Sequence, residues 1–282
     1  FKVALTGEGG DEFFCGYPTL HAAQIARYYR HLPKAVQTAL SAAIDRLPAG
    51  KGRLPLAFMA ESFSKAIEPD LIRTFFGFKE VLRHREWRDA LTDEAYAKIG
   101  EIDPAIAFYQ YRDKIEDWPL IDALSYLDIK VFLAGCSLLP NDNAFMASSV
   151  ETRIPLLDHK LVDFVTSLPL RHRFSPIEPK ALLKRAMRRF IDKTFPQARK
   201  ELAGYKKMGF EIPTTSWVNG RHLGGLISDM LSEANIRANG FFKPAFVRKL
   251  LDDQRAERRN NERRIQVVLA MEAFLGRTGH SF

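Results

Sequence analysis

The 282-residue chain lacks most features of a secreted or membrane-embedded protein. Its two cysteines, Cys15 and Cys136, form neither metal-ligand spacing nor a disulfide framework, and each is most simply interpreted as a small buried hydrophobic residue. The chain does not open with the charged and then apolar segments of a signal peptide. We find no apolar run near the roughly 18 residues that span a bilayer. These absences predict a cytoplasmic protein that binds no membrane.

Internal repeats and low-complexity tracts are also missing, and the first residue is Phe1 instead of Met, which leads us to expect a fragment of a longer protein. The formal net charge of +8 raises the question of nucleic-acid binding. The densest basic run, Arg255 to Arg264, contains glutamates and no aromatic residues that could stack on bases. We therefore expect this run to be a solvated helix face, and we expect no nucleic acid as a partner.

Residues 2–6 alternate as a strand does, and most of the remaining chain has the three- and four-residue apolar spacing of helices. No second strand is obvious. The helical patterns cover residues 21–32, 35–47, 80–91, 105–115, 120–135, 159–168, 178–191 and 262–275. We expect the apolar stripes of the segments 159–168 and 178–191 to pack in the core. A lone strand is not stable, so this strand should be a late one in a parallel sheet whose other strands lie upstream.

A glycine-rich loop with three carboxylates follows the strand, in the sequence TGEGGDE (Thr6 to Glu12). Ligands of open α/β sheets bind at the carboxyl ends of strands, where such a loop lies. Consecutive glycines allow backbone N–H groups to converge on a phosphate, and Asp11 offers a hard oxygen ligand for magnesium. Glu8, between glycines, is free to face a reacting group. On this evidence alone, an ordinary tight turn is the alternative.

Three ordered motifs resemble those of the class B, glutamine-hydrolysing asparagine synthetase family. They are LTGEGGDEFFCGY, FMASSVETRIPLLDHKLVDF and KKMGFEIPTTSW. The resemblance covers nearly the whole chain, because the final helical pattern is also similar to that of the family. It implies an α/β, mostly helical fragment: one strand of a parallel, PP-loop-type adenine-nucleotide-hydrolase-like sheet, followed by a helical body. Residues 1–282 would be the C-terminal portion of the synthetase domain.

The resemblance also implies roles for individual residues. Glu8 and Lys207 are the catalytic candidates, and Asp11 is the candidate magnesium ligand. The residues implied to contact ATP are Thr6, Gly7, Gly9 and Gly10. Asn143 and Phe145 depart from the arginine and serine that the family usually has at these positions. Glu151 and Arg153 match the family, and we interpret them as a buried or half-buried structural ion pair.

The implied activity is that of an ATP-dependent ligase that forms an amide. Aspartate or a related carboxylate would be activated as an acyl-adenylate and attacked by ammonia derived from glutamine. The implied cofactors are ATP and Mg²⁺, and the implied partners are upstream glutaminase and PP-loop regions of the same chain, with a homodimer as a further expectation. The family's S-G-G-x-D-S-S loop is absent from this sequence, so we expect the fragment alone to be inactive. The alternatives are a relative that amidates or cyclises another acceptor, and a catalytically dead helical scaffold.

Overall fold

The computed structural model describes residues 1–45, 63, 66–198, 223–256, 258 and 260–279. The chain divides into two compact units. The first unit combines Phe1–Lys79 with Ala105–Lys206, and the second combines Glu80–Pro104 with Lys207–Phe282.

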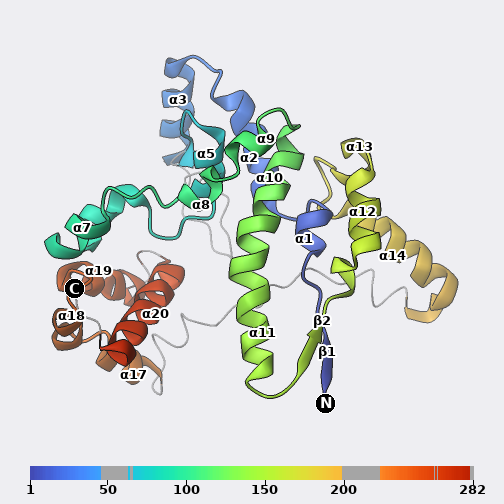
Figure 1. Ribbon diagram of the computed structural model, residues 1–282. Helices are drawn as coiled ribbons and strands as arrows, with labels where there is room; N and C mark the ends of the chain where they lie inside the picture. The colour runs from blue at the N-terminus through green and yellow to red at the C-terminus, as the bar shows by residue number, and fades with distance from the viewer. Residues whose placement is uncertain (46–62, 64–65, 199–222, 257, 259, 280–282) are drawn as a thin grey trace. The chain divides into compact units, whose positions relative to one another are not determined.

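The first unit is mostly helical, with two short strands (Figure 1). Its elements before the long central helix are β1 (Val3–Leu5), α1 (Gly10–Phe13), α2 (Pro18–Tyr29), α3 (Lys34–Asp45), α5 (Leu71–Gly77), α8 (Ile106–Tyr109) and α9 (Arg112–Ile115). The later ones are β2 (Glu151–Arg153), η3 (Pro155–Leu157), α12 (His159–Ser167), α13 (Leu170–Arg173), α14 (Ala181–Thr194) and η4 (Pro196–Ala198).

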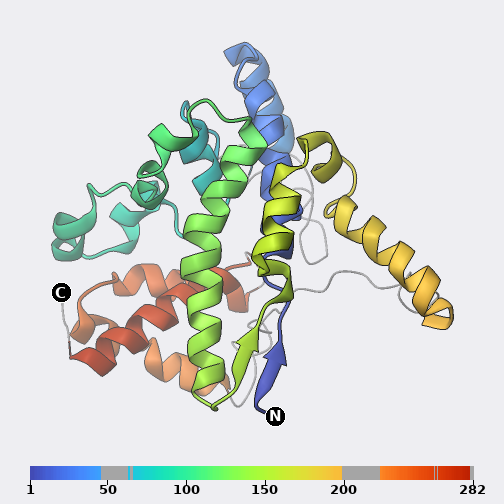
Figure 2. The same cartoon turned by 45° about the vertical axis from the view of Figure 1, so that its right-hand side comes forward.

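The two strands form a parallel pair, in which Val3 lies opposite Glu151 and Leu5 opposite Arg153. In both views the pair lies beside α11 (Leu139–Met146), the C-terminal part of the long central helix (Figures 1 and 2). The expectation that no second strand follows the first is therefore wrong. β2 is only three residues long, and only its middle residue is half-buried. A strand of this length is too short to show a periodic apolar pattern in the sequence. The described residues do not contain the other strands expected of a PP-loop-type sheet.

The central helix runs without a break through α10 (Leu120–Leu127), the π-helix η2 (Asp128–Leu138) and α11 (Leu139–Met146). It contains an 18-residue window with a mean hydropathy of 1.4, and 33% of that window is buried. By length and composition alone it is thus able to cross a membrane, which corrects the expectation that no such run exists. One such helix is weak evidence, because the core helices of soluble proteins pass the same test.

Two apolar clusters hold the first unit together. One gathers around Leu20, Phe75, Leu124 and Leu127, where α2, α5 and α10 meet. The other joins Phe13, Phe14, Leu133 and Val165, so it packs α1 against the central helix and α12. Helix starts are specified locally: Asp158 accepts hydrogen bonds from the backbone N–H groups of Lys160 and Leu161 at the start of α12.

The second unit is a set of short helices around one apolar cluster that includes Leu91, Ile236, Val247 and Ile265. Its elements are η1 (His84–Glu86), α6 (Trp87–Ala90), α7 (Asp93–Ile99), α17 (Leu223–Met230), α18 (Glu233–Asn239), α19 (Pro244–Arg255) and α20 (Glu262–Thr278). We expected the basic run 255–264 to form one helix face, and this expectation is wrong. Among its described residues, Arg255 ends α19 and Glu262 begins α20. Arg264 within it forms an ion pair with Glu86 at 2.9 Å.

Two of the predicted apolar stripes are only partly covered. In α12, Val165 is buried, but Phe164 is 60% exposed. α14 extends away from the central helix in both views, and its Met187 and Phe190 are exposed (Figures 1 and 2). The expectation of core packing is therefore wrong for these three side chains in the described structure.

Candidate functional site

The loop after β1 brings most of the predicted site residues together. The backbone N–H of Thr6 donates a 3.0 Å hydrogen bond to the carbonyl of Arg153, which extends the strand pairing by one residue. α1 begins at Gly10, so the loop has four residues between strand and helix. Six of the seven predicted residues, Thr6, Gly7, Glu8, Gly9, Gly10 and Asp11, lie in this loop or the first turn of α1. The seventh, Lys207, lies outside the described residues.

Gly9, at the end of the loop, and Gly10, at the start of α1, pack closely against η3. Gly9 has φ 83°, in the left-handed region that favours glycine, and a Cβ there would overlap the side chain of Leu157. A Cβ at Gly10 would lie 3.1 Å from Leu156. η3 comes from the second sequence motif, so these glycines allow the second motif to pack directly on the first.

Two side-chain oxygens in the loop are buried and have no hydrogen-bond partner among the described residues: Oγ1 of Thr6 and Oε2 of Glu8. The other carboxylate oxygen of Glu8, Oε1, accepts a hydrogen bond from the Nδ2 of Asn141 in α11. Buried polar atoms are nearly always paired in proteins, and an unpaired one has a free-energy cost. Two such atoms within three residues mark this loop as a place where a polar ligand would be stabilised.

Asp11 is held by a lysine that the sequence did not single out. Lys180, the residue before α14, places its Nζ 3.0 Å from an Asp11 carboxylate oxygen. Lys180 has φ 56°, which is uncommon for a residue other than glycine. Gly16 contributes as well, because a Cβ there would overlap both side chains. In the sequence Lys180 is one of many basic residues in the segment 178–191, and only its position in the fold distinguishes it.

The third carboxylate of the motif, Glu12, faces the core instead of the loop. It is 3% exposed and accepts a 2.6 Å hydrogen bond from the Tyr17 hydroxyl. Burial and this hydrogen bond raise the pKa of Tyr17. Nearby, Lys79 places its Nζ 2.9 Å from Asp128 and 4.8 Å from the ring centres of Tyr17, Phe75 and Phe132. Glu12 therefore anchors α1 to a buried polar cluster and is not part of the site.

Three other expectations can be compared with the structure. Glu151 and Arg153 do form an ion pair, at 3.0 Å, but both side chains are more than half exposed, so the predicted burial is wrong. Cys15 is buried, and burial raises the pKa of its thiol to about 11. Cys136 is exposed, which contradicts its interpretation as a buried residue. Asn143 and Phe145 lie in α11, Asn143 exposed and Phe145 half-buried.

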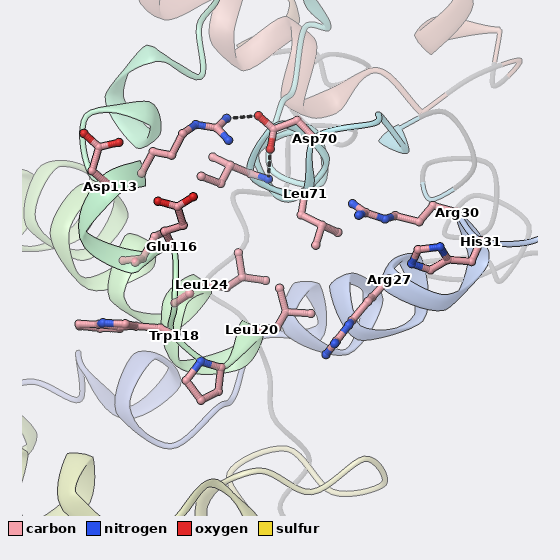
Figure 3. A pocket seen from close by; sticks show the side chains of 15 residues that line it. Arg27, Arg30, His31, Asp70, Leu71, Asp113, Glu116, Trp118, Leu120 and Leu124 are labelled. Atoms are coloured by element: carbon pink, nitrogen blue, oxygen red, sulfur yellow. Dashed lines mark hydrogen bonds and ion pairs between the residues drawn. The ribbon is translucent and has the colours of Figure 1, made fainter.

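A separate pocket of about 590 Å³ lies between α2, α5, α9 and α10 (Figure 3). Arg27, Arg30 and His31 line one wall, and Asp113 and Glu116 lie across from them. The Asp70 carboxylate already has two partners: it accepts a hydrogen bond from the backbone N–H of Ile72 at the start of α5, and it forms an ion pair with Arg112. The pocket contains none of the motif residues, and its charged walls are largely exposed to solvent. It therefore offers no preorganised reactive group.

The described residues contain no cluster of three or more histidine, cysteine, aspartate or glutamate side chains that could hold a metal ion. Asp11 is the only predicted metal ligand, and its carboxylate already pairs with Lys180. Magnesium prefers six oxygen ligands in an octahedral arrangement. The described residues therefore do not form a complete magnesium site by themselves, because waters or substrate phosphates would have to supply the remaining ligands beside Asp11.

The site is thus a glycine-rich loop at the carboxyl end of a parallel strand. Among the described residues, the loop oxygens Thr6 Oγ1 and Glu8 Oε2 have no hydrogen-bond partner. Comparison with known families agrees with the three motifs: the model of the Asparagine synthase family matches residues 1–276. The chain belongs to the Asparagine synthase family.

The chain is similar to "Asparagine synthetase [glutamine-hydrolyzing] 1" of Bacillus subtilis (strain 168), at 23% identity over 95% of this chain and 39% of the relative. It is also similar to "Amidase chyE" of Penicillium rubens, at 26% identity over 85% of this chain and 36% of the relative. A similar protein of Gibberella zeae, "Amidase chry2", is 25% identical over 85% of this chain and 36% of its own length. The chain thus spans well under half of these relatives. No solved structure matches the chain.

Proposed function

We propose that the protein is an ATP-dependent ligase that activates a carboxylate, with aspartate first among the acceptors, and joins it to ammonia derived from glutamine. The family membership supports the ligase chemistry. The observation that carries the proposal for this chain is the pair of buried, unpaired oxygens of Thr6 and Glu8 at the strand-end loop. Such a pair is expected where a ligand completes the hydrogen bonding.

ATP fits the chemistry of the loop. Thr6 offers a hydroxyl that is able to donate a hydrogen bond to a phosphate or ribose oxygen, and the glycines allow a close approach of the backbone. Lys180 and Lys207 are the proposed cations toward the phosphates. Bound ATP would supply the adenylyl group that turns a carboxylate into an electrophile. We keep Asp11 as a proposed magnesium ligand, but we assign no step to the ion, because the described residues do not complete its site.

Glu8 is the proposed base. When the ammonia nitrogen attacks the activated carbonyl carbon, a C–N bond forms, the bond to the AMP oxygen breaks and the nitrogen must lose a proton. The unpaired Oε2 of Glu8 is able to accept that proton. Lys207 has no described geometry, and its proposed role is to offset charge on the phosphate oxygens.

Glu8→Gln tests the proposal, because glutamine keeps the size of the side chain but accepts no proton at neutral pH. We expect this variant to form the acyl-adenylate, seen as aspartate-dependent exchange of labelled pyrophosphate into ATP, while amide formation falls by roughly 10²- to 10⁴-fold. The assay requires the protein with all residues that its gene encodes. Equal losses in exchange and amide formation would assign Glu8 to nucleotide binding, and full activity in both assays would remove it from the mechanism.

The proposal extends to the fold. We propose that β1 and β2 belong to a larger parallel sheet of the PP-loop type and that residues 1–282 are the C-terminal portion of a synthetase domain. The shares of 36–39% of the relatives' lengths support this, because most of each relative has no counterpart in the chain. The partners that we propose are a glutaminase region and a PP-loop region of the same chain, together with a second copy of the chain in a homodimer. Soluble, cytoplasmic placement is part of the same proposal.

A second candidate function is amidation of an acceptor other than aspartate. Two fungal relatives named as amidases match the chain at about the same identity as the Bacillus subtilis synthetase. Asn143 and Phe145 also depart from the family pattern in α11, the helix that contacts Glu8 through Asn141. Pyrophosphate exchange with a panel of carboxylates separates the two, since only the true acceptor supports exchange.

A further inference from the structure

We propose that Asn141 is a positioning residue that fixes the Glu8 carboxylate so that Oε2 is presented to the attacking nitrogen. This inference rests on the proposed function, in which Glu8 is the base. The contact joins two segments that are 133 residues apart in the sequence, the loop after β1 and the first turn of α11. No sequence motif predicted it.

The geometry divides the two oxygens of Glu8 between two tasks. Oε1 accepts the hydrogen bond from Asn141 Nδ2, whereas Oε2 is buried and has no partner within the part of the chain that the structure describes. The terminal torsion of a glutamate is broad and roughly two-fold, so an unrestrained carboxylate would exchange its oxygens freely. A hydrogen bond to one oxygen restricts this rotation and leaves the other oxygen with a single orientation. A base held in position reacts faster than one that must first be ordered.

The chemistry of an amide suits this task. Asn141 donates an N–H but carries no charge, so it orients the carboxylate without forming an ion pair with it. A lysine or arginine at this position would stabilise the carboxylate as an ion and make it a weaker base. An aspartate would accept instead of donate and would repel the ionised Glu8. Among residues of this size, asparagine thus gives orientation at the least cost in basicity.

The test uses Asn141→Leu and Asn141→Asp in the protein with all the residues that its gene encodes. Both keep the approximate shape of asparagine and remove the donor at neutral pH. For Asn141→Leu we expect aspartate-dependent pyrophosphate exchange and the KM for ATP to stay within about twofold of the wild type, while kcat for amide formation falls about 10- to 100-fold, as for other residues that orient a reacting group. Asn141→Asp should lose more, because it adds like charge beside Glu8.

A matched control is available in the second unit. Asn239 donates the same kind of hydrogen bond, at 2.7 Å, from its Nδ2 to the carboxylate of Glu272. Asn239→Leu should lower the melting temperature without separating exchange from amide formation. The inference is overturned if Asn141→Leu forms amide at the wild-type rate, or if exchange and amide formation fall together as in an unstable variant. If the wild type itself shows no aspartate-dependent exchange, the aspartate assignment fails, and the variants are compared with the acceptor that does support exchange.

Discussion

Asp128, at the junction of α10 and η2, is a carboxylate with no exposed surface. Burial raises its pKa to about 6, and the nearby Glu12 adds to this, while the ion pair with Lys79 opposes it. Since the pKa is raised in spite of Lys79, desolvation outweighs the attraction between the two charges. The desolvation of this carboxylate therefore favours its protonated form in the folded state.

Asp128→Asn tests this balance. Between the ordinary pKa of 3.8 and about 6, the folded wild type keeps a proton that the unfolded chain has lost, so its free energy of unfolding falls as the pH rises through that window. Asparagine does not titrate, so the variant lacks this loss. We expect the two proteins to be equally stable near pH 4 and the variant to be more stable at pH 7.5, by at most about 3 kcal/mol. Urea unfolding at both pH values measures the difference, and a less stable variant at pH 7.5 would show that the ion pair is net favourable.

Residues that share one segment of sequence were predictable, and residues that meet through the fold were not. The loop from Thr6 to Asp11 carries its own signal, because glycines and carboxylates stand together there. Asn141 and Lys180 are separated from it by at least 130 residues, and nothing in one sequence gives their distances to Glu8 and Asp11. Lys180 is additionally hidden among the other basic residues of its helix.

Among the elements, the turn from β1 into α1 has the strictest backbone requirement. Gly9→Ala would place a methyl group against Leu157 in a left-handed backbone conformation. We expect this variant to lose about 1–2 kcal/mol or more of unfolding free energy, since both the conformation and the contact are unfavourable.

Gly7→Ala is the matched control, because a Cβ at Gly7 would meet no atom within 4 Å. Its unfolding free energy should change by less than about 0.5 kcal/mol. Thermal or urea unfolding of both variants checks the pair. If Gly9→Ala were as stable as Gly7→Ala, η3 would have to move aside at little cost.

The long helices α2 and α20 were predictable as elements because each contains several turns of periodic apolar residues. β2 was not predictable, because a strand of three residues is too short to show an apolar periodicity in the sequence. The sequence also did not indicate the π-helix η2, whose eleven residues have the same apolar composition as an ordinary helix. The apolar pattern predicted this helix only over residues 120–135, and it indicated neither the continuation into α11 nor the hydrogen-bonding pattern of η2.

For the whole molecule, the distribution of apolar surface agrees with a chain that spans only 36–39% of its relatives. Leu5 is 73% exposed on β1, Phe164 is 60% exposed on α12 and Phe190 is 53% exposed on α14. Exposed apolar side chains are ordinary when they stand alone, whereas a large contiguous patch of them is typical of a surface that binds something.

We therefore expect residues 1–282, expressed alone, to self-associate as protein concentration rises. Multi-angle light scattering across a dilution series measures this. Phe164→Ser with Phe190→Ser should reduce the association without lowering the melting temperature, because both side chains are exposed. Ile102→Ser, at an exposed site in the second unit, is the control and should leave the association unchanged. A monodisperse wild-type chain at high concentration would contradict the expectation.

Because Glu12 points into the core, naturally occurring variants of this motif would lose function for two different reasons. Glu8 and Glu12 stand four residues apart in TGEGGDE, and loss of either would look the same in a growth assay. The causes would differ: if Glu8 is the base that we propose, its variant would accumulate as an intact but slow protein, whereas a Glu12 variant would leave the hydroxyl of the half-buried Tyr17 without its acceptor and be cleared by proteolysis. Protein abundance, measured beside growth, would therefore separate the chemistry of the motif from its architecture.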